Sequence, residues 1–209
     1  FTFLIIRHIY YIYILYMPKY FHFTTPKEKF TGQLQSSQCT ATTKKGARCK
    51  RNVVIGGPYC RVHLLYKDEI KVLDSTIPEA EKGLFAYNVD SKKGDVIFEK
   101  GEHIVDYGGE TIDNETLTNR YGEYTAPYGL QIFKGKYRDG ALKRSSGTLV
   151  NHQPSVKANA KFSVSTKTNI PKIVATKPIK QSQEIFVNYG RQYKLKEPGV
   201  RFRTSLRQF

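Results

Sequence analysis

From residue 68 onward the chain consists of short β-prone apolar runs separated by turn signals such as Lys92-Lys93-Gly94-Asp95. This rhythm is typical of a mostly-β domain built from small sheets. We therefore predict strands at Ile70–Leu73, Leu84–Tyr87, Val96–Phe98, Ile104–Tyr107, Tyr128–Phe133, Lys161–Ser165, Lys172–Ala175 and Glu184–Asn188.

Two segments depart from the β rhythm. The segment from Asp113 to Tyr121 predicts a short helix, with Ile112 and Leu117 available to pack. Residues 24–38 are polar, show no sustained period and predict a linker. A length of 209 residues favours one main domain with a small appendage.

The positive charge is concentrated at the two ends of the chain. The formal net charge is +16, of which residues 1–67 carry +10, residues 68–190 carry +1 and residues 191–209 carry +5. Basic ends of this kind favour contact with a polyanion such as nucleic acid or chromatin. A solvated, solubilising surface is the alternative interpretation.

The three cysteines lie within 22 residues, in the pattern Cys39-x9-Cys49-x10-Cys60-x2-His63. An odd number in one cluster is a poor disulfide framework and suits a reducing compartment, the nucleus or the cytoplasm. Three thiolates and one imidazole form a complete tetrahedral ligand set for a structural Zn²⁺. The alternative is three free or buried thiols beside a surface histidine.

Residues 1–16 are strongly apolar but are interrupted by Arg7-His8 and are shorter than the roughly 20 residues of a spanning helix. The only methionine is Met17. We expect translation to start at Met17, with an apolar or membrane-associating segment as the alternative. No firm membrane association is predicted.

Five motifs follow one another in the β-rich part of the chain. They are Lys82-Gly83-Leu84-Phe85-Ala86, Tyr107-Gly108-Gly109-Glu110, Leu149-Val150-Asn151-His152, Ala158-Asn159-Ala160-Lys161-Phe162 and Glu184-Ile185-Phe186-Val187-Asn188-Tyr189-Gly190. In this order and at this spacing they resemble a SET-domain protein lysine methyltransferase. The chain has no cysteine after Cys60, as in compact viral and bacterial members of that family. The short basic cysteine segment in turn resembles Cys3His modules of large-virus and phage proteins.

The resemblance implies a mostly-β SET domain of small sheets whose C-terminal segment forms a pseudoknot. It divides the chain into an apolar segment and linker, a zinc module, the SET domain and a basic tail, at residues 1–37, 38–67, 68–193 and 194–209.

The resemblance also implies a site for S-adenosyl-L-methionine at Lys82, Gly83, Leu84, Tyr128, Asn151, His152 and Tyr189. In it, residues 82–84 form a loop that offers backbone groups, and glycine permits their close approach. Asn151 and His152 hold the adenine end. Tyr189 is the expected catalytic residue, and Tyr107 lines the channel for the substrate lysine. Tyr193, Phe202 or Phe209 would have to cover that channel.

Several positions depart from the family pattern. Glu81 replaces a glycine, Gln153 replaces a serine and Thr148 replaces an arginine. The leading hypothesis is methyl transfer to the ε-amine of a protein lysine, with a histone as one candidate substrate. The alternative is an inactive SET fold that binds nucleic acid or chromatin through its basic zinc module. We expect a nuclear or cytoplasmic protein, with a viral protein in a host cell as one form of this.

Overall fold

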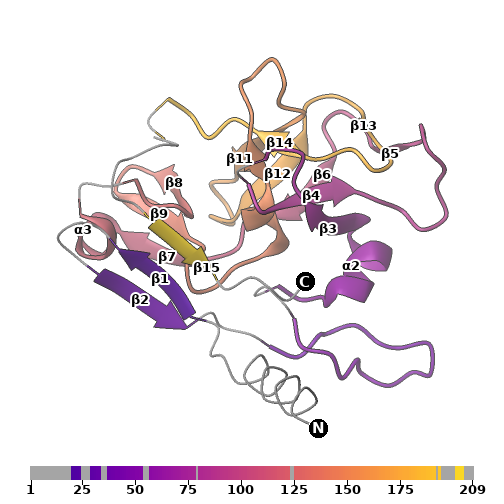
Figure 1. The fold of residues 1–209 in the computed structure, drawn as a ribbon, viewed down its shortest axis with the longest axis horizontal. Coiled ribbons are helices and arrows are strands. Elements are labelled where there is room, and N and C mark those ends of the chain that lie inside the picture. Colours follow the sequence, from indigo (N-terminus) through magenta and orange to yellow (C-terminus); the bar gives the residue numbers. More distant parts are fainter. Residues whose placement is uncertain are drawn as a thin grey trace, which may run out of the picture.

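A computed structural model describes residues 20–24, 29–33, 37–53, 57–78, 80–122, 125–191, 193 and 201–204 (Figure 1). The described chain forms small sheets of two or three strands and two α-helices, α2 and α3. This confirms the mostly-β fold class. Among the described residues no helix has the length and apolar character needed to cross a membrane.

Two sheets carry most of the central core. Strand β3 (Ile70–Asp74) pairs antiparallel with β4 (Lys82–Ala86), and the other sheet has the order β11-β12-β6, from Ala160–Val164, Pro171–Ala175 and His103–Asp106. Alternate residues of β12 are buried, as expected for a strand with one face on a core. Ile70, Leu84 and Ile173 are fully buried there. A further pair joins β5 (Val96–Phe98) and β13 (Ile179–Lys180).

A second part of the fold is the sheet β7-β9-β8, from Glu110–Asp113, Lys136–Asp139 and Gly129–Phe133, with α3 (Asn114–Tyr121) beside it. The side chain of Asp113 accepts a hydrogen bond from the Thr116 backbone N–H at 2.8 Å, so it caps the helix. The helix ends at Gly122, whose φ of +61° favours glycine.

The C-terminal segment of the domain lies between two other parts of the chain. Strand β14 (Phe186–Val187) pairs in parallel with β10 (Asn151–His152), which follows the 3₁₀ helix Ser146–Leu149. On the other side, the Ile185 backbone N–H donates to the Leu84 carbonyl oxygen at 2.8 Å. A short parallel pair thus joins segments distant in sequence, and the pseudoknot itself stays a prediction.

The cysteine segment forms a separate small core below the sheets (Figure 1). Cys39, Ala41, Cys49, Val53 and Cys60 are buried together. Helix α2 (Arg61–Lys67) follows Cys60, and its Leu64 packs against the central core. The cysteine segment is thus attached to the larger domain through α2.

The structure corrects the prediction for the chain ends. The expected linker contains β2 (Lys29–Gln33), and the expected basic tail contains β15 (Arg201–Thr204). Both pair with β1 (Tyr20–Thr24) in a sheet of order β15-β1-β2. Polar and basic residues hid these strands, because strand formation here depends on a partner distant in sequence. Residues 1–16 and Met17 lie outside the described residues.

Candidate active site and metal centre

The C-terminal segment brings Tyr189 beside the Asn151-His152 pair. The Tyr189 backbone N–H donates to His152 Nδ1 at 3.0 Å, and the two rings lie 5.3 Å apart. The Tyr189 hydroxyl donates to the Val150 carbonyl oxygen at 2.7 Å. The segment Val150–His152 therefore holds Tyr189 at two points, its backbone N–H and its hydroxyl, although His152 and Tyr189 are 37 residues apart.

Burial raises the pKa of Tyr189, and nearby Tyr193 and Tyr128 raise it further. The phenol therefore stays neutral and acts as a hydrogen-bonding group. The Tyr193 ring packs edge-on at 4.7 Å, and its hydroxyl donates to the Pro127 carbonyl oxygen at 3.1 Å. Tyr193 thus packs against Tyr189, and its expected role as a cover of the lysine channel stays a prediction. The Phe202 side chain and Phe209 lie outside what the structure describes.

Tyr107 is hydrogen-bonded to the backbone of Tyr128, close to Tyr189. The Tyr107 hydroxyl donates to the Tyr128 carbonyl oxygen at 2.9 Å, and the Tyr107 ring packs edge-on against Phe162. Burial raises the pKa of Tyr107 well above its usual value, with Tyr189 as the next cause. Tyr107 is therefore a neutral, buried phenol, and its electrostatic coupling places Tyr189, which is partly buried, close to it.

Arg144 supports Tyr128, and sequence reasoning missed it. Its guanidinium lies 3.9 Å from the centroid of the Tyr128 ring, and the residue is 1% exposed. Thr148 stands at the position where the family usually has an arginine. Arg144 lies four residues earlier in the sequence. Only the fold shows that an arginine at this earlier position reaches the site.

A buried carboxylate, Glu184, joins three segments around the predicted cofactor site. It accepts hydrogen bonds from Ser75 Oγ at 2.7 Å, the Thr76 backbone N–H at 2.7 Å and Asn151 Nδ2 at 3.0 Å. Asn151 Nδ2 also donates to the Lys82 carbonyl oxygen at 2.9 Å. Sequence reasoning placed Glu184 in a motif but gave it no role.

The structure corrects the predicted loop at Lys82-Gly83-Leu84. All three lie in strand β4, and Gly83 and Leu84 are buried there. A Cβ on Gly83 would lie 2.1 Å from Glu184 Oε1, so glycine makes room for the carboxylate at this position. Leu84 packs in the core, which leaves Lys82 as the partly exposed member of the three.

The chemistry of these groups fits S-adenosylmethionine, whose amino group and sulfonium are cationic. No hydrogen bond among the described residues uses Asn151 Oδ1, an acceptor suited to an ammonium group. Tyr128 and Tyr189 present aromatic surface, which attracts cations. His152 is neutral near pH 7, because burial lowers its pKa below the usual 6.5.

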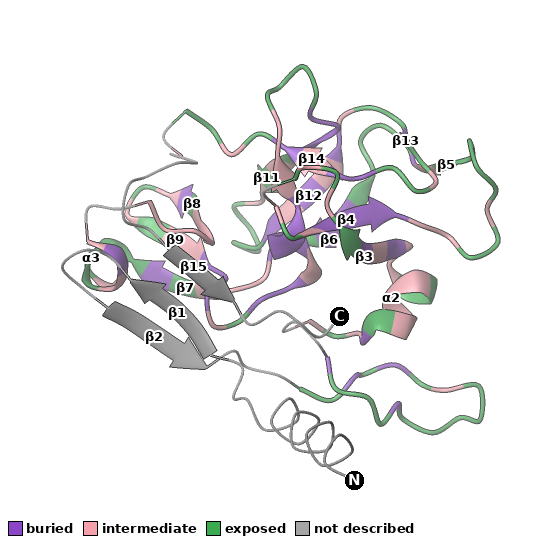
Figure 2. Ribbon diagram, viewed as in Figure 1, coloured by how far each residue is buried: buried purple, intermediate pink, exposed green. Residues whose placement is uncertain are grey.

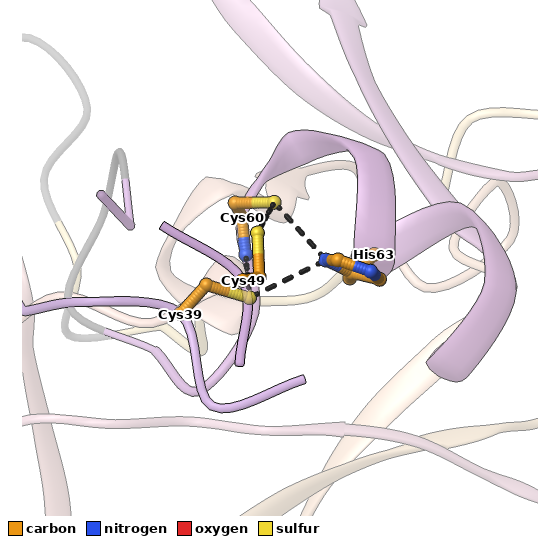
Figure 3. Close-up of side chains that lie close together, drawn as sticks. All are labelled: Cys39, Cys49, Cys60 and His63. Carbon is orange, nitrogen blue, oxygen red and sulfur yellow. Dashed lines mark hydrogen bonds between the residues drawn. The ribbon is translucent and has the colours of Figure 1, made fainter. Parts of the chain in front are cut away.

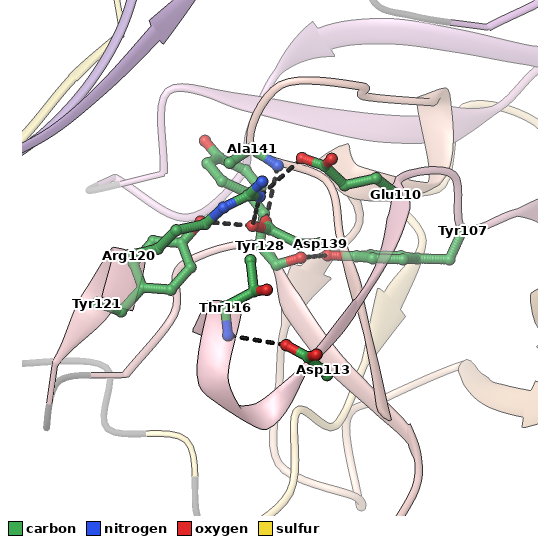
Figure 4. Close-up of polar contacts among 9 residues, drawn as sticks. All are labelled: Tyr107, Glu110, Asp113, Thr116, Arg120, Tyr121, Tyr128, Asp139 and Ala141. Atoms are coloured by element: carbon green, nitrogen blue, oxygen red, sulfur yellow. Dashed lines mark hydrogen bonds and ion pairs between the residues drawn. The ribbon is translucent and has the colours of Figure 1, made fainter. Parts of the chain in front are cut away.

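A network centred on Asp139 lies next to the hydrogen bond between Tyr107 and Tyr128 (Figure 4). Asp139 is fully buried and accepts hydrogen bonds from Arg120 at 2.7 Å, the Tyr121 hydroxyl at 2.8 Å and the Ala141 backbone N–H at 2.9 Å. The next residue, Gly140, donates its N–H to the Tyr128 carbonyl oxygen. The network thus ties α3 to the backbone that holds Tyr128. The sequence carried no motif for it.

Asp139→Asn is expected to lower the free energy of unfolding by about 2 kcal/mol, because charge-assisted hydrogen bonds of a buried group are lost. Urea unfolding measures this. Asp74→Asn is the matched control, since the Asp74 carboxylate pairs with Lys82 at the surface. The control should lose less than about 1 kcal/mol. Equal losses in the two variants would contradict a structural role for the network.

The four predicted metal ligands come together in one cluster (Figure 3). Their ligand atoms all lie within 4.8 Å of one another. Cys49 Sγ and Cys60 Sγ are 4.0 Å apart, and His63 Nδ1 is 3.4 Å from the sulfurs of Cys39 and Cys60. Tetrahedral zinc with ordinary bond lengths gives edges of about 3.8 Å between sulfurs and about 3.6 Å from sulfur to nitrogen.

The cysteines are free thiols, and their spacing is far longer than a disulfide bond of about 2.05 Å. Burial raises the pKa of the Cys60 thiol, but hydrogen bonds from His63 and Val62 outweigh it and lower this pKa to about 6. Cys60 is therefore a thiolate near neutral pH, which is the form that binds metal. The cluster could hold a metal ion with all four tetrahedral positions occupied by protein.

The His152 hydrogen bond should depend on pH. The unfolded imidazole takes a proton near pH 6.5, whereas the folded one does so only at lower pH. The contribution of neutral His152 to the free energy of unfolding is therefore fully present above the unfolded pKa. It is lost as the pH falls from the unfolded pKa to the lower folded pKa. Thermal unfolding from about pH 8 to about pH 5 measures the loss, with 6.5 as the reference pKa.

His152→Asn should remove this loss, because an amide oxygen can accept the Tyr189 N–H and does not titrate. His103→Asn, at an exposed histidine paired with Asp106, is the control. If His152→Asn and wild type lose stability identically with falling pH, His152 is not the group responsible.

The comparison with known families agrees with this geometry. A family model described as "SET domain" matches residues 48–190. The match covers more than half of the chain and includes Tyr107, Asn151, His152 and Tyr189. The chain therefore belongs to the SET domain family, whose members are typically protein lysine methyltransferases. No curated protein matches the chain.

Solved structures with a similar fold include polycomb repressive complex 2 (PRC2) from Chaetomium thermophilum. One such structure, of ctPRC2 in complex with H3K27me3 and H3K27M, has 21% identity and a TM-score of 0.50, over 66% of this chain and 17% of that chain. The crystal structure of the complex has 22% identity, a TM-score of 0.49, and coverage of 64% and 16%. An autoinhibited form bound to S-adenosylmethionine has 24% identity, a TM-score of 0.47, and coverage of 59% and 15%. This chain thus spans about a sixth of the length of these neighbours.

Proposed function

We propose that the protein transfers a methyl group from S-adenosylmethionine to the ε-amine of a lysine in a protein substrate. The observation that carries the proposal is the position of Tyr189, a neutral and partly buried phenol beside the Asn151-His152 pair, with the buried phenol of Tyr107 nearby. Membership of the SET domain family supports the same activity.

The residues act mainly by orientation. A substrate lysine has a pKa near 10.4 in water, and an apolar aromatic channel favours its neutral form by desolvation. The backbone carbonyl oxygens that accept from Tyr189 and Tyr107, at Val150 and Tyr128, fix the directions of the two hydroxyls. Two positioned phenols hold the amine in a reactive orientation, an effect that contributes about 7–11 kcal/mol in favourable cases.

S-adenosylmethionine, when bound, supplies an electrophilic methyl group on sulfur. In this proposal Lys82 offers backbone groups to it, and Asn151 and His152 hold its amino and adenine ends. Tyr128 and Tyr189 pack beside it. Gly83 and Leu84 form the floor beneath, because both are buried in β4.

The metal in this proposal is a structural Zn²⁺ at Cys39, Cys49, Cys60 and His63. Four protein ligands leave no open position for a substrate or water. Its effect is to fold the cysteine segment, whose described part buries Ala41 and Val53 beside the three ligand cysteines.

The substrate class is a protein lysine, and a histone is one candidate. A fold neighbour has been solved with H3K27me3 and H3K27M, which suggests histones as the first proteins to assay. A mixed cell extract should be assayed in parallel, because the likeness is one of fold. The expected result with labelled S-adenosylmethionine is a labelled protein band that identifies the substrate.

The full chain should be run beside Tyr189→Phe, with cofactor binding measured by calorimetry. Labelling by wild type that the variant loses supports the proposal. Absence of labelling together with absence of cofactor binding would overturn it and favour an inactive SET fold. Cofactor binding without labelling would contradict the histone assignment.

A further inference from the structure

The hairpin that carries Cys39 and Cys49 has an inner face of metal ligands and an outer face of cations. Cys39, Ala41 and Cys49 are buried, whereas Arg48 and Lys50 are exposed between and beside them. Residues 37–67 carry seven exposed basic side chains: Lys44, Lys45, Arg48, Lys50, Arg51, Arg61 and Lys67. Figure 2 shows this segment as a largely exposed arm at the edge of the molecule.

Apart from Asp68 and Glu69, which follow Lys67, these cations have no acidic neighbours in the sequence. Residues 38–67 contain no Asp or Glu, and every ion pair among the described residues involves Lys82, His103 or Arg120 instead. Their mutual repulsion therefore goes uncompensated by carboxylates of the described chain. A surface of this kind favours a partner that supplies many negative charges.

The backbone holds the cations in a fixed arrangement. The Cys39 N–H donates to the Arg51 carbonyl oxygen at 2.9 Å, and the Cys49 N–H donates to the Ala41 carbonyl oxygen at 2.8 Å. Arg48 Nε donates to the Cys39 carbonyl oxygen at 3.1 Å. A rigid display lowers the conformational entropy lost when a partner binds.

A second lysine turn in the chain shows what a solvated surface turn looks like. Lys92-Lys93-Gly94 has the same sequence and glycine conformation as Lys44-Lys45-Gly46, with φ values of +103° and +79° for the glycines. The second turn, however, is flanked by Asp90 and Asp95, and Asp95 accepts the Lys92 N–H at 2.7 Å. The turn in the cysteine segment lacks such acids.

We propose that the outer face of this segment, residues 37–67, binds the sugar-phosphate backbone of nucleic acid without sequence specificity. Seven exposed cations suit a regular series of phosphates better than the mixed surface of a folded protein. Tyr66 on α2 is 59% exposed and adds an aromatic surface on which a base can stack. This inference goes beyond methyl transfer and does not depend on it.

The test is fluorescence anisotropy of the full chain with labelled oligonucleotides of one length. Duplex DNA, single-stranded DNA and RNA form the three arms, and the arm with the highest affinity identifies the source of the phosphates. The expected Kd at physiological salt lies at about 10⁻⁴–10⁻⁶ M, the range of non-specific binding. Titrations at several salt concentrations give the slope of log K against log salt.

The variant Lys44→Ala/Lys45→Ala should weaken binding and make the slope shallower by about 1.8 on duplex DNA, or about 0.9 for each lost phosphate contact. Lys92→Ala/Lys93→Ala is the matched control and should leave the slope unchanged. Both variants retain the basic chain ends, so any binding of nucleic acid by those ends contributes equally to the two measurements.

Three results would overturn the inference. They are no binding at low salt, equal effects of the two lysine pairs, and equally tight binding of polyglutamate, which would indicate an acidic protein as the partner. None of these results bears on methyl transfer, so failure here is distinguishable from failure of the proposed enzyme activity.

Discussion

Tyr189→Phe is expected to lower kcat for methyl transfer by about 10²–10³-fold, the range for removal of one positioned donor in an active site. The phenylalanine ring can keep the packing against His152 and Tyr193, which lie 5.3 Å and 4.7 Å away. The backbone N–H of residue 189 is also retained. Only the hydroxyl, and with it the hydrogen bond to the Val150 carbonyl oxygen, is removed.

Because the remaining contacts persist, cofactor affinity and thermal stability should change little. The loss should therefore fall on kcat, a pattern that separates positioning of the amine from binding. Steady-state kinetics and calorimetric binding measure the two quantities. Tyr137→Phe is the control, since Tyr137 lies in β9 and, among the described residues, its hydroxyl donates a hydrogen bond only to the Asn114 side chain of α3.

If Tyr189→Phe and Tyr137→Phe retain equal activity, the Tyr189 hydroxyl takes no part in transfer. If Tyr189→Phe instead loses cofactor binding, the residue shapes the cofactor site and the amine is held by another group. Tyr107 is then the remaining phenol, and Tyr107→Phe becomes the decisive variant.

Removal of the metal is the second large effect. Structural zinc contributes on the order of 10 kcal/mol to small zinc-dependent folds, so a strong chelator should unfold residues 37–67. Because Leu64 of α2 packs on the central core, the melting temperature of the larger domain should fall as well. Metal analysis should find one zinc per chain, and hydrogen exchange should report the lost protection.

His63→Ala tests the same site at one ligand, and His103→Ala is the matched control at an exposed histidine. The His63 variant should lose zinc and α2 protection, while the control should keep both. A protein that contains no metal as purified, and whose exchange pattern ignores the chelator, would contradict a zinc-dependent module.

The sequence predicted the central strands well, because their signals are local. β-prone runs bounded by glycine turns correspond to β3, β4, β5, β6, β8, β11, β12 and β14. Asp113 caps the start of the predicted helix and Gly122 ends it, so both helix signals lie within ten residues of sequence. The Cys3His ligand set was also predictable, since the residue types specify metal chemistry at any spacing that a loop can close.

The strands β7, β9, β10 and β13 were not predicted as strands, because their sequences, ETID, KYRD, NH and IK, contain no apolar run. They form where the fold supplies a partner, as β10 does for β14. The sheet β15-β1-β2 was not predicted because it pairs segments from opposite ends of the chain, and β2 and β15 are rich in polar and basic residues.

The same distinction between local and tertiary information applies to the candidate site. The sequence by itself determined the family motifs, the identities of Tyr189, Tyr107, Asn151 and His152, and the metal ligands. Only the tertiary structure decided that Gly83 accommodates Glu184, and that Arg144 and Asp139 support Tyr128. A buried charge is tolerated only where partners from several segments meet it, and those partners become neighbours only when the chain folds.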